Sequence, residues 1–368
     1  MSSATAANSL TPPATRADHD RAIAWWLIVC AVMVFLMVLI GGITRLTESG
    51  LSITEWQPVE GVLPPLSPAQ WQDAFTRYQA IPQFHAIHAG MTLDQFKGIY
   101  FWEYLHRLWG RLIGIVFFLP FLWFLCRGRI GRPLWPKLAL IFVLGALQGL
   151  LGWYMVKSGL EHRIEVSQYR LAAHLFAAIL IYGAILWVAF DLFRRPSESG
   201  ALEQRGAGAL SSSSPARQIA IARVLNAVLL LVAFTLVAGA FVAGLRAGSI
   251  YNTFPLMGDR MIPGDYAALS PFWRNWFENP AAAQFNHRVL AQATWLVVVL
   301  LWLFGRRRTA GAARQALDVL AAAATLQAAL GIATLLSIVA LPLAAAHQAG
   351  AVVLVTAALY ARHAFEGR

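Results

Sequence analysis

The stretch EYLHRLWGR, residues 103–111, places a glutamate and a histidine three residues apart at the start of a long apolar run. Residues three apart share one face of a helix, so Glu103 and His106 are expected to be neighbours. An ionisable pair at the edge of a hydrocarbon span is costly to keep, which indicates a functional site with partners elsewhere in the chain. The candidate partners are three more histidines in apolar runs, His174, His287 and His347.

The composition of the 368-residue chain is that of a membrane protein. Hydrophobic residues make up 58% of the chain and charged residues 13%, which leaves too few polar groups to cover a soluble surface. Eight apolar runs of about 20 residues are long enough to cross a hydrocarbon core of about 30 Å as helices. The sequence therefore predicts an all-α polytopic membrane protein with transmembrane helices at residues 24–44, 104–125, 137–157, 171–192, 223–245, 285–304, 317–337 and 342–361.

The net charge of +11 does not indicate a nucleic-acid partner, because the basic residues are spread over alternate loops and form no stripe with aromatic residues. Arginine and lysine are concentrated before the first span and after the second, fourth and sixth spans. By the positive-inside rule these segments are cytoplasmic, and both the N- and C-termini lie with them. The other loops carry mixed charge and are expected outside.

The second half of the chain repeats the first. Three motifs recur: LQGLLG at 147–152 as LQAALG at 326–331, HR at 106–107 again at 287–288, and AAH at 172–174 again at 345–347. With four spans in each copy, both copies enter the membrane from the same side. We therefore expect a parallel repeat of two pseudo-symmetric four-helix bundles, related by an axis along the membrane normal.

The repeat and the apolar runs also predict domain boundaries. These are a disordered cytoplasmic tail at 1–22, an N-terminal four-helix half at 23–195, a cytoplasmic linker at 196–222 and a C-terminal four-helix half at 223–368. The N-terminal half contains a long outer loop, residues 46–102. Within it, residues 67–80 begin with Ser67 as a candidate N-cap and a proline at the first helical position. We expect either a helix lying on the membrane interface as a lid or ordinary loop packing.

The four intramembrane histidines are predicted to lie at one depth, because each is near the start of an even-numbered span that begins outside. A lone histidine in a span is more often a hydrogen-bonded packing residue than a ligand, but four at repeat-equivalent positions favour ligation. Two imidazoles from facing helices can supply both axial positions of a heme iron, whereas zinc or copper would need further ligands. We predict one bis-histidine heme site in each half, His106 with His174 and His287 with His347.

Two arginines and one acidic residue accompany these histidines. Arg107 and Arg288 follow their histidines directly, and each could pair with a porphyrin propionate or snorkel to the lipid headgroups. The repeat places Gln284 at the position equivalent to Glu103, so only the first half has a carboxylate that could move protons or stabilise a cation. The alternative role for Glu103 is a structural pair with Arg107.

At these residues the chain resembles heme A synthase, in the form found in alpha-proteobacteria and mitochondria. The resemblance covers nearly the whole chain, and it is carried by GGITRLTESGLSITEW with QPVEGVLPP (41–65), FWEYLHRLWGR (101–111), the paired LQGLLGW and LQAALG, and FNHRVLA (285–291). It implies an eight-helix membrane oxidoreductase that oxidises a methyl group of heme O to a formyl group, giving heme A for cytochrome oxidase assembly.

The resemblance also implies how the site residues divide between the halves. Heme b would be bound by His287 and His347, while heme O as substrate and heme A as product would occupy the half with His106 and His174, where Glu103 is the acidic residue. The implied location is the bacterial inner membrane, in contact with lipid. The implied candidate partners are heme O synthase (a farnesyltransferase), oxidase assembly factors and a second copy of the chain. Some relatives carry a cysteine pair in the first outer loop, which is absent here.

Two other classes of protein remain as alternatives. A membrane di-heme b-type electron-transfer protein would use the same four histidines, but it would place pairs at both membrane faces. A transporter with parallel repeats would show polar, broken helices near the midplane. Here Gln148 and Gln327 are the main polar residues at that depth, and we expect each to make a helix-packing hydrogen bond.

Overall fold

The structure, a computed structural model, describes residues 16–55, 60–162, 164–194 and 215–366. Within these ranges the chain forms helices, turns and loops, with one isolated β-bridge between Met257 and Arg260. Eight helices are long and apolar enough to cross a membrane, as the sequence predicts. They are α1 (Arg16–Leu46), α4 (Leu93–Cys126), α5 (Trp135–His162), α6 (Gln168–Arg194), α8 (Pro215–Gly244), α10 (Pro280–Arg306), α11 (Gly311–Leu336) and α12 (Leu341–Ala364).

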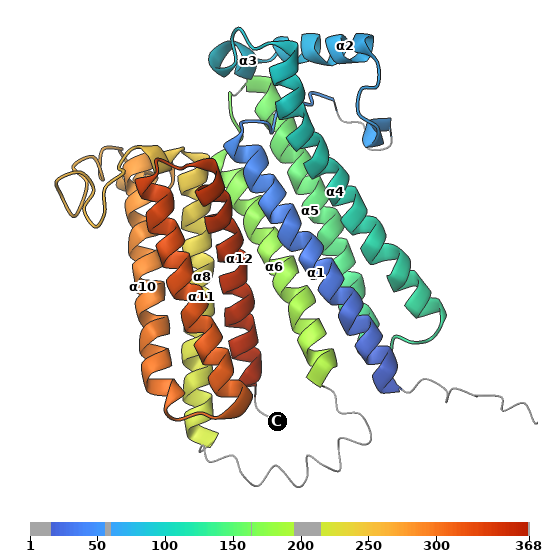
Figure 1. The fold of residues 1–368 in the computed structure, drawn as a ribbon, viewed down its shortest axis with the longest axis vertical. Helices are drawn as coiled ribbons and strands as arrows, with labels where there is room; N and C mark the ends of the chain where they lie inside the picture. Colours follow the sequence, from blue (N-terminus) through green and yellow to red (C-terminus); the bar gives the residue numbers. More distant parts are fainter. Residues whose placement is uncertain (1–15, 56–59, 163, 195–214, 367–368) are drawn as a thin grey trace, which may run out of the picture.

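The short helices gather at one end of the long ones (Figure 1). They are η1 (Glu60–Val62), α2 (Pro68–Gln79), α3 (Pro82–Ile87), η3 (Ala247–Ser249), η4 (Phe272–Arg274) and α9 (Asn275–Glu278). At the other end α1 begins and α12 ends (Figure 1). The long helices present apolar surface outward: Leu140, Leu147 and Leu150 of α5 are each more than half exposed. Such a surface suits lipid, where backbone polar groups must be paired within the helix itself.

Figure 1 shows α1, α4, α5 and α6 in one group and α8, α10, α11 and α12 in another. The groups meet where α1 and α6 contact α8 and α12. Hydrogen bonds cross this boundary from Tyr182 to Thr356 (2.7 Å between hydroxyls) and from Gln348 Nε2 to the carbonyl of Val38 (2.8 Å). At the upper end α8 approaches α6 so closely that a Cβ on Gly244 would lie 2.7 Å from the Cα of Gln168. Only glycine allows this approach.

Three predicted helix starts differ from the structure by eight residues or more. Helix α1 begins at Arg16, so residues 16–22 belong to it and not to a tail, and α8 begins at Pro215 inside the predicted linker. Helix α4 begins at Leu93, inside the predicted outer loop, because Thr92 and Gln95 form a capping box at its start. Residues 1–15 of the predicted tail and 196–214 of the predicted linker lie outside the described residues.

The helix predicted at 67–80 is confirmed as α2, with a capping box between Ser67 and Gln70. Its aromatic face packs around Phe96, a fully buried residue in the extension of α4. The ring centroids of Trp71, Phe75 and Tyr78 lie 6.5, 5.1 and 5.2 Å from that of Phe96. The apolar side of α2 is therefore covered by the protein's own α4, and this aromatic cluster fixes the outer loop above the spans.

Candidate functional site

Each of the four intramembrane histidines packs its ring against a glycine of a neighbouring helix. The pairs are His106 with Gly41, His174 with Gly152, His287 with Gly239 and His347 with Gly331. A Cβ built on these glycines would lie 3.0, 2.9, 3.0 and 2.9 Å, respectively, from the nearest ring atom. That is closer than side chains normally pack, so the space for each ring depends on the missing side chain. The repeat seen in the sequence is thus also a repeat of contacts.

The C-terminal pair has a geometry that fits a shared metal ion. The ring centroids of His287 and His347 are 6.4 Å apart, with the ring planes at 78°. Two imidazoles on opposite sides of one metal, each with a metal–nitrogen bond of about 2 Å, have centroids roughly 6 Å apart. His287 Nδ1 donates to the carbonyl of Thr235 at 3.0 Å, which leaves Nε2 to bind a metal.

The N-terminal pair lacks such a bond. The Nδ1 atom of His174 is buried and has no hydrogen-bond partner among the described residues. His106 turns Nε2 and Cδ2 toward Gly41, whereas the other three histidines present Cε1 to their glycines. Nδ1 of His347 is likewise buried and without a hydrogen-bond partner among the described residues. Both pairs therefore offer half-buried imidazoles from facing helices, and they differ in the bond that fixes His287.

Glu103 is 2% exposed, and its carboxylate oxygens are the acceptors in every hydrogen bond described for this side chain. Its Oε2 accepts from Ser52 Oγ and from the backbone N–H of Ile53, both at 2.8 Å. Its Oε1 accepts from Arg107 Nη2 at 2.6 Å and from Arg107 Nε at 3.1 Å. This set of donors suits an ionised carboxylate. The pair with Arg107 is present, and it places a buried negative charge one helical turn from His106.

The two arginines hold the outer loops of their own halves. Arg107 donates to the carbonyls of Ile53 (2.8 Å) and Glu55 (3.0 Å). Arg288 makes the equivalent contacts with the carbonyls of Tyr251 (2.7 Å) and Thr253 (2.9 Å). Each guanidinium therefore holds the segment that follows the first helix of its half, close to the histidine that precedes the arginine in the sequence.

Gln284 uses its position in the opposite sense to Glu103. It is also 2% exposed, but its Nε2 donates to the carbonyl of Tyr251 at 3.1 Å. Its Oε1 is buried and has no hydrogen-bond partner in the part of the chain that the structure describes. The first half thus has a buried acceptor with charge, and the second has a neutral donor.

The expected packing bonds of Gln148 and Gln327 are confirmed. Their Nε2 atoms donate to the backbone carbonyls of His174 (2.7 Å) and His347 (3.0 Å). The glycines under the rings were missed by sequence reasoning, although LQGLLG ends at Gly152 and LQAALG ends at Gly331. The final glycine of each motif was the signal that could have identified them.

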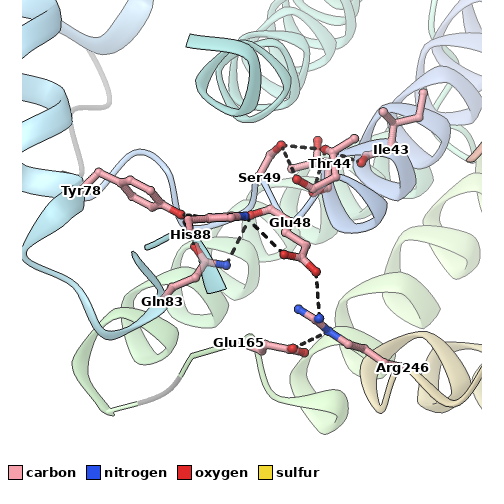
Figure 2. A network of polar contacts seen from close by, with 10 residues as sticks. Ile43, Thr44, Glu48, Ser49, Tyr78, Gln83, His88, Glu165 and Arg246 are labelled. Atoms are coloured by element: carbon pink, nitrogen blue, oxygen red, sulfur yellow. Dashed lines mark hydrogen bonds and ion pairs between the residues drawn. The ribbon is translucent and has the colours of Figure 1, made fainter. Parts of the chain in front are cut away.

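An ionic cluster joins the segment that carries α2 and α3 to both helix groups (Figure 2). Glu48 contacts Arg246 at 2.8 Å and His88 Nε2 at 3.3 Å, and Glu165 contacts Arg246 at 2.5 Å. The hydroxyl of Tyr78 lies 2.5 Å from Nδ1 of His88. Burial, followed by the negative charges of Glu103 and Glu48, raises the pKa of Tyr78. His88 thus takes part in this cluster through both ring nitrogens.

A second polar cluster contains His363. It is 6% exposed, lies within α12, and its Nε2 is 3.0 Å from Asp191 of α6. Asp191, His363 and Glu366 each have one nitrogen or oxygen atom that could bind a metal ion, and these three atoms lie within 4.8 Å of one another. Arg194 pairs with Glu366 at 2.9 Å and with Asp191 at 3.6 Å, so an arginine already supplies positive charge there. This cluster joins the two helix groups at the end of the long helices opposite α2 and α3.

Fold and site together define a polytopic helical membrane protein with two pairs of half-buried, glycine-packed histidines. The chain matches the COX15-CtaA family, described as cytochrome oxidase assembly protein, over residues 24–359. It belongs to this family, as the sequence motifs indicate. The chain is 51% identical to the heme A synthase of Rhodospirillum centenum over 362 residues, which cover 96% of this chain and 92% of the relative.

Other relatives are similar over the same extent. Identity is 49% with the heme A synthase of Parvibaculum lavamentivorans, covering 95% of each chain. It is 48% with the heme A synthase of Nitrosospira multiformis, covering 94% of this chain and 93% of the relative. The resemblance stated from motifs therefore extends over nearly the full length of the protein.

Proposed function

We propose that this chain converts heme O to heme A, by oxidising a methyl group of the porphyrin to a formyl group. Family membership and relatives of about half identity, all named heme A synthase, support this activity. The observation that carries the proposal is the pair of half-buried, glycine-packed histidines in each half, with a buried carboxylate beside the first pair only. One half suits a reaction and the other suits a resident cofactor.

The C-terminal pair, His287 and His347, holds heme b in this proposal. Its support is the 6.4 Å spacing of the rings and the bond that fixes Nδ1 of His287 to Thr235. Heme b bound there would supply one-electron transfer. The N-terminal pair, His106 and His174, takes heme O as substrate and releases heme A. Among the described residues this pair has no Nδ1 bond like that of His287, so it is held at fewer points, which suits a ligand that enters and leaves.

Glu103 contributes a fixed negative charge next to the substrate. Oxidation of a porphyrin methyl group builds positive charge on that substituent, and a buried carboxylate held by four hydrogen bonds stabilises such charge without rearranging. Arg107 keeps this carboxylate oriented and closes the loop over it. Arg107 and Arg288 already donate hydrogen bonds to backbone carbonyls. A porphyrin propionate that binds either arginine would therefore share the guanidinium group with those carbonyls.

The membrane arrangement belongs to the same proposal. The two helix groups form pseudo-symmetric halves about an axis along the membrane normal, with both termini on the cytoplasmic side of the bacterial inner membrane. Equivalent glycine, arginine and glutamine contacts in the two groups support the pseudo-symmetry. Basic loops at the end where α1 begins support the orientation. Heme O synthase, oxidase assembly factors and a second copy are proposed partners.

Pigment extraction from the purified protein tests the proposal. We expect heme b together with heme O or heme A. His287→Ala and His347→Ala should lose the low-spin heme b spectrum, while His106→Ala and His174→Ala should keep it and form no heme A. A protein in which His106→Ala loses heme b and His287→Ala keeps it would reverse the assignment of the halves.

A further inference from the structure

One helix in the first group holds a histidine of the next helix at two points. Gln148 of α5 donates its Nε2–H to the backbone carbonyl of His174 at 2.7 Å. Gly152, four residues further along α5, receives the ring of the same histidine. Residues four apart lie on one face of a helix, so a single face of α5 contacts both the main chain and the side chain of His174.

The second group repeats this contact with different helices. Gln327 of α11 donates to the carbonyl of His347 at 3.0 Å, and Gly331 receives the ring of His347. These two residues occupy the same places in LQAALG that Gln148 and Gly152 occupy in LQGLLG. The longest of the three recurring motifs is therefore the motif that contacts a histidine.

A glutamine is a costly residue at this position. The Oε1 atoms of Gln148 and Gln327 are both buried, and neither has a hydrogen-bond partner among the described residues. A buried acceptor without a donor loses the hydrogen bond that water would supply, which lowers stability. An apolar side chain of similar size would pack between the helices without that penalty. The amide occurs in both halves despite this cost, which points to the bond that it donates.

We propose that Gln148 and Gln327 are positioning residues that set the orientation of His174 and His347 toward heme. Each amide fixes the backbone of the turn that carries the histidine, so the ring enters the glycine recess and keeps a ring nitrogen directed at the iron. The other ligand of the C-terminal pair is held differently, because His287 is fixed through its ring by Thr235. This inference rests on the proposed function, since it requires that the histidines bind heme.

Gln327 offers the cleaner test, because heme b is expected to stay bound during purification. The full-length protein and its Gln327→Met and Gln327→Glu variants are depleted of heme and titrated with ferric heme b, following the low-spin spectrum and the reduction potential. Methionine keeps the size but cannot donate, so affinity should fall about 10- to 100-fold, the usual effect of losing an outer-shell partner. A tenfold loss confined to the ferric form would raise the potential by about 59 mV.

The glutamate variant separates positioning from packing. A protonated carboxyl group can donate to the His347 carbonyl as the amide does, whereas a carboxylate can only accept. Burial between the helices favours the protonated carboxyl group. Gln327→Glu should therefore bind heme b like the wild type, whereas Gln327→Met should bind it more weakly.

Two further variants serve as matched controls. Gln348 is next to His347 on α12, but its Nε2 donates to Val38 of α1 at 2.8 Å. Gln348→Met should therefore leave the heme b affinity and potential unchanged. Gln148→Met acts on the other half, so it should leave heme b in place and weaken retention of heme O.

Wild-type affinity, spectrum and potential in Gln327→Met would overturn the inference. If that variant does not fold, Gln327→Leu takes its place, because leucine also packs between helices without donating a hydrogen bond; wild-type heme b affinity in Gln327→Leu would equally overturn the inference. Failure of the proposed function has a different signature. In that case His347→Ala itself keeps heme b, whereas loss of heme b in His347→Ala with retention in Gln327→Met rejects only the positioning role.

Discussion

At the scale of single residues, the two halves differ most in what they place beside the first histidine. Glu103 receives four hydrogen bonds from donors, whereas Gln284 donates to a carbonyl. An amide in place of Glu103 would turn its N–H group toward Arg107 or toward the Ser52 turn. The exchange that looks neutral from the repeat therefore removes a charge and sets donors against donors.

We expect Glu103→Gln to form at least about 10²-fold less heme A, the scale of one electrostatic or general acid–base contribution. Heme b should remain, because its histidines lie in the other helix group. The measurement is heme A formed per mole of heme b. Asp94→Asn is the control, since Asp94 makes an exposed pair with Lys97 of little energetic value. A ratio within a few-fold of the wild type would make Glu103 a structural residue.

The glycine recesses lead to a second prediction. A Cβ at residue 331 would lie 2.9 Å from Cε1 of His347, so Gly331→Ala must displace the ring or separate α11 from α12. We expect loss or distortion of the low-spin heme b spectrum. Gly149→Ala is the matched control, because a Cβ at Gly149 of α5 would meet no atom within 4 Å. Equal spectra in both variants would contradict a role for the recess.

At the scale of elements, the lid segment depends on one buried aromatic ring. Phe96 is 0% exposed and contacts Trp71, Phe75 and Tyr78 of α2. Phe96→Ala should lower the stability of the fold around α2 and α3 by about 3–5 kcal/mol. Limited proteolysis should therefore cut residues 80–92 faster, with the heme b spectrum unchanged. Phe101→Ala, at a half-exposed position of the same helix, should leave the cleavage rate unchanged.

The number of spans could be predicted from the sequence because apolar length alone decides membrane crossing. Their ends could not, because hydropathy does not detect a capping box such as Thr92 with Gln95, or a helix that continues outside the membrane to bury Phe96. The histidines could be predicted because an imidazole in an apolar run is rare. Gly41 and Gly239, which lie outside the repeated motifs, could not, because small residues are common in spanning helices and their partners lie on other helices.

At the scale of the whole molecule, the proposed orientation predicts the side of each loop. A reporter fused after Arg308, in the basic loop between α10 and α11, should behave as cytoplasmic. A reporter fused near Asp265, in the loop between α8 and α10, should behave as external. The two proteins should give opposite signals with a reporter active on one side only. A reversed result would place the histidine layer at the inner face.

The four histidines form one layer across the molecule. Gly41 and Gly239, beneath His106 and His287, each lie five residues before the end of their helix, and the other two histidines are each the seventh residue of α6 or α12. The line from one proposed heme site to the other therefore runs parallel to the membrane plane. Carrying one elementary charge across 100 mV requires about 2.3 kcal/mol, but an electron exchanged within this layer crosses almost none of the transmembrane voltage. Electron exchange between the two sites should therefore proceed equally well in energised and in depolarised membranes.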